Sequence, residues 1–190
     1  DEISAISFVH QSTAELEFGD KTNSVNLLVG GEDMGQFFDL HDGSTTLSLP
    51  GDGEALISVG VAELLDISAG DEIVVRNADS EALHVTVSGV FDNHVFNYVI
   101  VNPQTYESQL GEAPEYQVAF ATVPEGKDPR VVGADFSALN NVMNVTVSEA
   151  LADQVGSMLE VLDLIVATVI VCAALLAVIV LYNLTNINIT

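Results

Sequence analysis

The 190-residue chain is poor in cationic residues, cysteine and tryptophan. Four Lys and Arg residues stand against 28 Asp and Glu residues, which gives a formal net charge of −24. Binding to nucleic acid requires clustered Lys and Arg side chains, so the composition argues against nucleic acid as a partner. The one cysteine, Cys172, lies within an apolar run, which excludes a disulfide framework and a cysteine-based metal site.

The acidic composition has two ordinary interpretations that need no ligand. Carboxylates keep a protein soluble, and they are also typical of adaptation to high salt, where ions screen the repulsion between like charges. The near absence of Lys favours adaptation to salt. A cationic peptide or metal ions would also be attracted to such a surface, so the sequence leaves open whether the acidity serves recognition.

A long apolar run lies near the C-terminal end. Residues 164–182 are nineteen consecutive residues without charge and with Thr168 as a polar interruption. As a helix they extend over about 28 Å, enough to cross a hydrocarbon core of about 30 Å, and the buried core helix of a soluble protein seldom stays apolar on every face for so long. We therefore predict a transmembrane helix whose residues include Leu164, Ile165, Val169, Leu175, Leu176, Val180 and Tyr182.

An amphipathic stalk helix is predicted over residues 146–163. The segment Thr146–Glu149 matches a capping box, which marks a helix start. Apolar residues then recur at three- and four-residue steps on one face, namely Leu151, Val155, Met158, Leu159 and Leu162. With no proline after the capping box and Gly156 as the one weak point, stalk and span predict a continuous rod of roughly thirty-five residues, about 50 Å long.

Residues 1–145 predict a mixed, largely antiparallel α+β domain. Alternating apolar residues such as Leu83, Val85 and Val87 indicate strands with one buried face, and Pro103 suits the first position of a short helix. Val61, Leu64 and Leu65 are expected on one face of another short helix. The predicted strands cover 3–9, 14–18, 25–29, 45–49, 55–58, 72–76, 83–88, 98–101, 118–120 and 143–147, and the predicted helices lie within 32–40, 61–66, 103–110 and 128–139.

No catalytic or nucleotide-binding pattern is complete. The segment 19–22, GDKT, has acidic residues where a phosphate-binding loop needs glycines, so we expect no ATP site and no cofactor. Five candidate metal ligands, Glu32, Asp33, Asp39, His41 and Asp42, are close in sequence but match no calcium loop, and a solvated loop is the favoured interpretation.

The remaining candidate groups give no enzyme hypothesis. His94 could act as a base with Asp92, but no nucleophile lies in a recognisable turn, and we predict no catalytic residues. His10 and His84 are expected on polar strand faces. The group Phe91, Val95, Phe96 and Tyr98 favours core packing over an exposed contact for a ligand or subunit.

Two stretches resemble the FtsX/MacB-type permease subunits of ABC transporters. Residues 56–73, LISVGVAELLDISAGDEI, are similar to a strand, short helix and Gly-Asp turn of their extracytoplasmic domain. Residues 166–190, ending VLYNLTNINIT, are similar to the end of the second transmembrane helix, and 99–106, VIVNPQTY, is a weaker third match.

The resemblance implies a non-catalytic permease subunit in a multi-pass cell-membrane protein. Residues 1–163 would be extracytoplasmic, and 183–190 would begin a cytoplasmic segment. The implied partners are a cytoplasmic ABC ATPase subunit, a second permease copy and the lipid bilayer, together with an extracytoplasmic ligand that the sequence does not identify. The chain would couple ATP hydrolysis inside the cell to movement or substrate handling outside. The alternative is a single-pass, membrane-anchored binding or adhesion protein.

Overall fold

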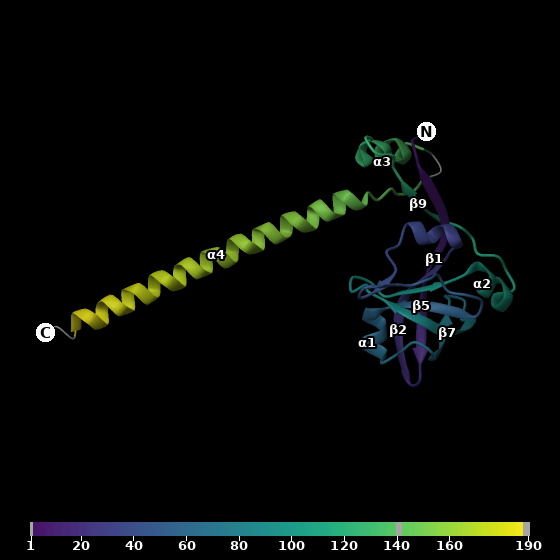
Figure 1. The fold of residues 1–190 in the computed structure, drawn as a ribbon, viewed down its shortest axis with the longest axis horizontal. Helices are drawn as coiled ribbons and strands as arrows, with labels where there is room; N and C mark the ends of the chain where they lie inside the picture. Colours follow the sequence, from purple (N-terminus) through teal and green to yellow (C-terminus); the bar gives the residue numbers. More distant parts are fainter. Residues whose placement is uncertain (1, 140–141, 188–190) are drawn as a thin grey trace. The chain divides into compact units, whose positions relative to one another are not determined.

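A computed structural model describes residues 2–139 and 142–187, with the side chains of 149–155, 157, 158, 160 and 185–187 outside the description. The chain forms two compact units, Asp1–Pro124 and Glu125–Thr190. A mixed sheet and helices make up the described residues, which confirms the predicted α+β class (Figure 1). The predicted ends of the extracytoplasmic domain at 145, of the stalk at 163 and of the transmembrane helix at 182 stay predictions.

The first unit holds the strands and the shorter helices. Its elements are β1 (Ala5–Phe18), β2 (Lys21–Val29), the 3-10 helix η1 (Glu32–Gln36), β3 (His41–Asp42), β4 (Thr45–Thr46), β5 (Glu54–Ser58), α1 (Val59–Leu65), β6 (Glu72–Arg76), β7 (Ala82–Phe91), β8 (Tyr98–Val101), α2 (Pro103–Leu110) and β9 (Val118–Thr122).

Six of these strands close into a barrel. Following the hydrogen-bonded neighbours, β1 pairs with β2, β2 with β8, β8 with β5, β5 with β7, β7 with β6, and β6 again with β1. The β2–β8 and β5–β7 pairs are parallel and the other four are antiparallel, so the sheet is largely antiparallel as predicted. Closure leaves the six strands without a free edge where they pair in this ring.

Strand β1 is a single element, whereas the sequence predicted two separate strands at 3–9 and 14–18. Residues Ala5–Val9 pair with β9, while residues from His10 onward pair with β2 and, at Glu15–Glu17, with β6. The polar interval Gln11–Thr13 suggested a break. The chain stays extended there because its backbone passes directly from one set of partners to the next.

The barrel strands β2, β5 and β8 are buried on both faces. Their inward side chains join those of β1, β6 and β7 in one apolar cluster that includes Leu16, Leu27, Ile57, Val75 and Val85. Their outward side chains Leu28, Leu56 and Ile100 pack in a second cluster with Met34 of η1 and Leu40. The barrel interior is therefore a filled core, and the segment after β2 covers part of its outside.

The two α-helices of the first unit are each followed by a residue in the left-handed conformation, and α2 also has a capped start. In α2, Pro103 occupies the first turn and the Asn102 side chain accepts a hydrogen bond from the Thr105 backbone N–H at 2.7 Å. Helix α1 ends at Leu65 and is followed by Asp66, which adopts a left-handed conformation with φ of 66°. Val61 and Leu65 are buried, whereas Leu64, which was expected on the same face of the helix, is exposed.

The second unit contains α3 (Pro129–Ser137) and α4 (Ser148–Ile187). The strand predicted at 143–147 is wrong, because residues 142–147 have no strand and Met143 is fully exposed. A Cβ atom on Gly133 of α3 would lie 2.9 Å from Val147 Cγ2 and 3.4 Å from Val145 Cγ1. The alternating valines therefore pack against a helix rather than a sheet.

Helix α4 begins at Ser148, two residues after the predicted cap at Thr146. The Glu149 side chain, which would complete the capping box, lies outside the described residues. Gly156 is exposed within the helix, and among the described residues no atom apart from its chain neighbours and the helix's own backbone lies within 4 Å of where its Cβ would be. The predicted continuity of stalk and span agrees with this 40-residue helix.

Candidate functional site

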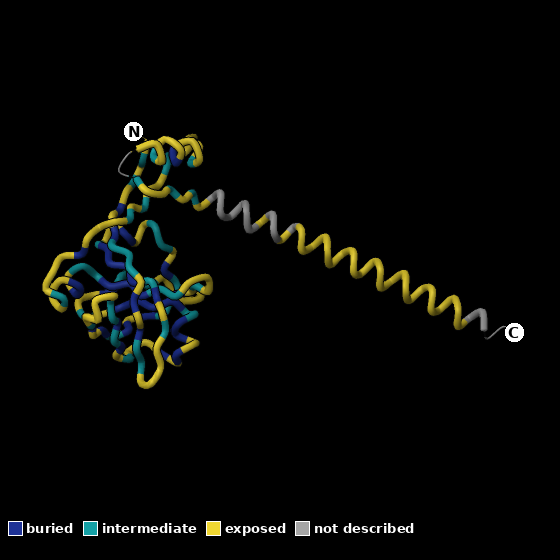
Figure 2. Tube along the Cα trace, turned by 180° about the vertical axis from the view of Figure 1, so that it is seen from behind, coloured by how far each residue is buried: buried dark blue, intermediate teal, exposed yellow. Residues whose placement is uncertain are grey.

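The residues Val161–Leu184 of α4 are long and apolar enough to cross a membrane, and none of this stretch is buried. Figure 2 shows the described part of the stretch exposed along its length. A core helix of a soluble protein would instead be mostly covered. The predicted span, 164–182, lies inside this stretch, and its assignment to the bilayer remains a prediction.

The polar interruption in the apolar stretch is satisfied within the helix itself. The Thr168 hydroxyl donates a hydrogen bond to the Leu164 carbonyl oxygen at 2.8 Å. In a hydrocarbon environment a polar group without such a partner costs several kcal/mol, so this local bond suits a helix in contact with lipid.

The predicted stalk face is described only in part. Leu159 and Leu162 are both exposed. The side chains of Leu151, Val155 and Met158 lie outside the described residues. The amphipathic stalk therefore stays a prediction.

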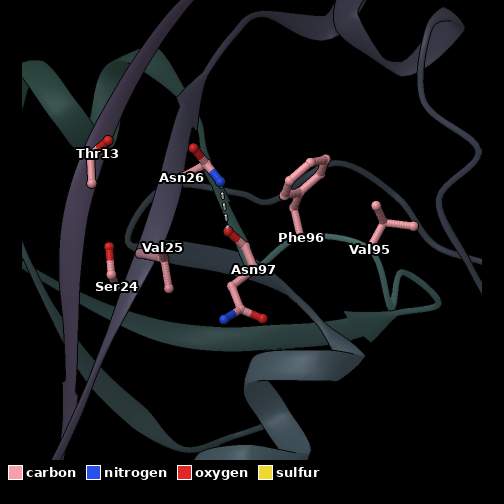
Figure 3. Close-up of a pocket in the computed structure, with 7 residues that line it drawn as sticks. All are labelled: Thr13, Ser24, Val25, Asn26, Val95, Phe96 and Asn97. Carbon is pink, nitrogen blue, oxygen red and sulfur yellow. Dashed lines mark hydrogen bonds between the residues drawn. The ribbon is translucent and has the colours of Figure 1, made fainter. Parts of the chain in front are cut away.

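An uncharged groove lies between the hairpin of β1 and β2 and the segment 95–97 that leads into β8. Its volume is about 340 Å³, and none of its lining residues is charged although the chain carries a net charge of −24. The lining consists of Thr13, Ser24, Val25, Asn26, Val95, Phe96 and Asn97 (Figure 3).

Hydrogen bonds around Asn97 fix one wall of this groove. The Asn97 carbonyl oxygen accepts from the Asn26 backbone N–H at 2.8 Å and from Asn26 Nδ2 at 3.4 Å. The Asn97 side chain donates through Nδ2 to Asn23 Oδ1 at 2.8 Å. The groove therefore offers amide and hydroxyl groups beside the Phe96 ring, a combination suited to a neutral, hydrogen-bonding ligand rather than to an ion.

The predicted aromatic group is divided by the structure. Phe91 is 4% exposed and packs in the second apolar cluster, with Leu28 and Leu56, as the prediction of core packing expects. Val95 and Phe96 lie on the surface, and Phe96 is 60% exposed. Its ring meets that of Tyr98 edge-on, with centroids 6.2 Å apart, and burial raises the pKa of Tyr98. Core packing is thus wrong for Val95 and Phe96.

A second, wider groove runs beside α1 and has an acidic lining. It measures about 510 Å³ and includes Asp42, Glu63 and Asp66 with the apolar side chains Leu47 and Val90. Ser68 and Ser88 also line it. Its charge resembles that of the rest of the surface, so it gives no separate indication of a ligand.

The candidate metal ligands do not converge. His41 Nδ1 lies 3.2 Å from Asp39 Oδ1, and His41 Nε2 lies 3.8 Å from Asp92 Oδ2, while Glu32 and Asp33 form the first turn of η1. Within residues 2–139 and 142–187, no three His, Cys, Asp or Glu residues are grouped so that they could hold a metal ion. The arrangement supports a solvated loop.

The other chemical groups have structural roles. Gly19 adopts φ of +59° in the turn between β1 and β2, and Lys21 Nζ donates to the Leu65 carbonyl oxygen at 3.1 Å. Asp92 Oδ2 accepts from the Gly43 backbone N–H at 2.8 Å. The pairing of Asp92 with His94 as a catalytic dyad thus gains no support, and His94 itself is exposed.

The two strand histidines fit their expected positions on polar faces. His10 on β1 is hydrogen-bonded to the Glu115 carbonyl oxygen at 2.9 Å and to the Ser12 hydroxyl at 3.1 Å. The exposed His84 exchanges two backbone hydrogen bonds with the Gln109 side chain. His10 also packs on the Tyr106 ring, with centroids 5.3 Å apart. These contacts hold α2 and the segment after it against the barrel.

Comparison with known proteins shows that this chain resembles solved structures in its fold. No protein-family model matches the sequence, and no curated protein matches it. The fold is similar to the extracellular domain of the noncanonic ABC-type transporter YknZ from Gram-positive bacteria, with a TM-score of 0.52 and 17% identity over 70% of this chain and 72% of that domain.

A second solved structure shares the fold. It is the periplasmic region of MacB from Actinobacillus actinomycetemcomitans, with a TM-score of 0.52 and 11% identity over 82% of this chain and 77% of that region. At these identities the similarity shows a common fold. The resemblance to MacB-type domains that three stretches of sequence predicted is therefore confirmed as a resemblance of fold.

Proposed function

We propose that the chain is the extracytoplasmic domain and a transmembrane helix of an ABC transporter permease subunit. One observation carries the proposal: a domain with the fold of the YknZ and MacB outer domains is followed, in the same chain, by an apolar helix that is wholly exposed over Val161–Leu184. Water would disfavour such a surface, and a bilayer would accept it.

The proposed role of α4 is mechanical. A helix of 40 residues is about 60 Å long, roughly twice the thickness of the hydrocarbon core. Its apolar part would lie in the bilayer, and the part from Ser148 would continue on the outer side. A displacement imposed by a cytoplasmic ATPase partner would then reach the outer domain through one continuous backbone.

The outer domain would handle or sense a substrate without chemistry of its own. His10, His41 and Asp92 are all occupied by contacts within the domain. The uncharged groove beside Phe96 is the proposed contact for an extracytoplasmic ligand, because its amide and hydroxyl groups are suited to a neutral polar molecule.

Affinity purification of the full-length gene product from a mild detergent, followed by mass spectrometry, tests this function. We expect an ABC ATPase subunit in stoichiometric amount. An unrelated membrane protein with the same tag is the control for non-specific capture. Reproducible absence of an ATPase, together with a gene product that crosses the membrane once, would contradict the proposal and favour a single-pass binding or adhesion protein.

A further inference from the structure

The β1–β9 ribbon, defined as Ala5–Val9 of β1 together with β9, ends the sheet with an unprotected edge. In the described part of the chain β9 pairs with β1 alone, in regular antiparallel register from Ala5 opposite Thr122 to Val9 opposite Val118. Natural edge strands usually carry a charged residue, a proline or a bulge that prevents pairing with another chain. The segment 117–123, QVAFATV, has neither charge nor proline.

The outward face of the ribbon is apolar as well. Ile6 and Phe8 point away from the core and are 44% and 56% exposed. Their cross-strand neighbours, Ala121 and Ala119, are also exposed. On the other face of the ribbon, Val9 belongs to the second apolar cluster, and Val118 and Phe120 pack against that cluster. The ribbon therefore presents an apolar surface directly beside the outer edge of β9, which no other strand of the described residues pairs with.

Charge indicates which partner can occupy this edge. Two copies of a chain with net charge −24 repel each other wherever carboxylates face carboxylates. Residues 3–9 and 117–123 contain no charged side chain, so two ribbons can meet without that repulsion. A partner selected for the acidic surface would be cationic and would gain nothing from this uncharged ribbon.

We propose that the ribbon is the contact between two copies of this chain, with β9 of one copy antiparallel to β9 of the other and the pairing centred within Ala119–Ala121, the middle of the strand. Such a pairing is self-complementary, as the two-fold axis of a symmetric dimer requires. The proposal rests on the proposed function in one respect, since that function implies two permease copies in one membrane. It adds the surface at which their outer domains meet.

The size of the ribbon sets the conditions for this contact. The surface that a strand of five residues can bury is far smaller than the roughly 800 Å² that each partner buries in a standard stable interface. The contact therefore needs the high effective concentration that anchoring in one bilayer provides. We expect it in membranes and expect little of it for dilute outer domain in water.

Disulfide trapping in phosphatidylcholine vesicles tests the contact with the whole 190-residue chain. Cys172 is first replaced by Ala, and single cysteines are then introduced as Ala119→Cys or Ala121→Cys. Residues directly opposite in antiparallel strands have Cα atoms about 4.5–5.5 Å apart, which is within the range for a disulfide. Thr22→Cys, on an exposed strand position outside the ribbon, is the matched control.

The pattern of cross-linked dimers identifies the register. A pairing centred on residue 119 links Ala119→Cys to itself, and one centred on 121 links Ala121→Cys to itself. A pairing centred on Phe120 links only a mixture of the two variants. Adding Phe8→Glu to the variant or mixture that cross-links should weaken the cross-link, because Phe8 lies beside Ala119 on the exposed apolar face of the ribbon and a carboxylate there replaces apolar surface with charge, whereas Thr22→Glu should leave it intact.

Cross-linking no greater than that of Thr22→Cys in all three samples, with far-ultraviolet circular dichroism unchanged, would overturn the proposal. It would mean that another part of the chain or lipid covers the ribbon. This result is independent of the ATPase experiment. Failure to cross-link while an ATPase co-purifies rejects the ribbon contact alone, and cross-linking without an ATPase rejects the transporter function alone.

Discussion

The barrel interior and the helix α4 are built from the same kinds of side chain in opposite surroundings. Leu27 in the barrel has no exposed surface, whereas Leu176 on α4 is 63% exposed. The barrel leucine contributes to stability by leaving water. An equally apolar leucine on α4 gains nothing until another apolar phase covers it. Hydrophobicity alone therefore does not identify a core, and burial in the folded chain does.

The strongest test of this contrast is Leu27→Ala against Leu176→Ala. We expect Leu27→Ala to lower the free energy of unfolding of the outer domain by about 2–5 kcal/mol, because it leaves a cavity in a filled core. Leu176→Ala should leave that free energy unchanged. Urea unfolding followed by circular dichroism measures both variants, and equal losses would mean that α4 packs on the barrel.

A charge introduced into the apolar stretch of α4 tests whether that stretch needs an apolar environment. Ala173→Asp lies near the middle of Val161–Leu184, where insertion of Asp into a bilayer costs about 2.5–3.5 kcal/mol. We expect a large fall in the fraction of chain that resists alkaline extraction from membranes. The matched control is Ala78→Asp, in an exposed turn. If both variants stay fully inserted, the stretch does not span the bilayer.

The continuity of α4 is tested at Gly156. Gly156→Pro should kink the helix and cost about 2 kcal/mol relative to glycine, while Gly156→Ala should stabilise it by about 1 kcal/mol. Spin labels on the outer domain of the assembled transporter, measured with and without ATP, should show movement in the Ala variant and loss of it in the Pro variant. Movement retained in both would exclude α4 as the transmitting rod.

The smallest expected effect concerns pH. Burial raises the pKa of Tyr106, and the carboxylates of Glu112, Glu81, Asp79 and Glu115 raise it further. Because the folded state holds the phenol proton more tightly, this contribution is complete below the ordinary tyrosine pKa of about 10 and is lost as pH rises through the folded value.

Removing the phenol should flatten this pH dependence. We expect the urea midpoint of the native chain to fall more steeply than that of Tyr106→Phe as the pH rises above about 10. Tyr98→Phe, at the other tyrosine whose pKa burial raises, should give a flattening of the same sign. Parallel curves for the native chain and Tyr106→Phe would contradict the assignment.

Local patterns predicted the elements whose partners are close in sequence or whose two faces differ. The alternation at Leu83, Val85 and Val87 gave β7 correctly because one face of that strand is buried and the other is partly wet. Pro103 marked the start of α2. The apolar run of α4 was predictable from length alone, since no packing partner is needed to recognise it.

Long-range contacts explain what the sequence did not show. Barrel closure depends on pairings such as Leu16 with Val75, which no local pattern encodes. The valines at 145 and 147 alternate like a strand but lie against Gly133. Phe91 and Phe96 are five positions apart, yet the turn after β7 buries one ring and exposes the other. The uncharged groove likewise combines the first hairpin with residues 95–97.

The three ladders of β1 also constrain the order in which the domain can fold. Its hairpin with β2 closes within the first 29 residues, but the bond from the Ser4 side chain to the Thr122 carbonyl oxygen joins positions 118 apart. Pairings so distant in sequence form slowly. During synthesis the first strand therefore stays incompletely paired until nearly the whole outer domain has been made. A chain released before β9 would leave Ala5–Val9, about a third of β1, exposed to aggregation.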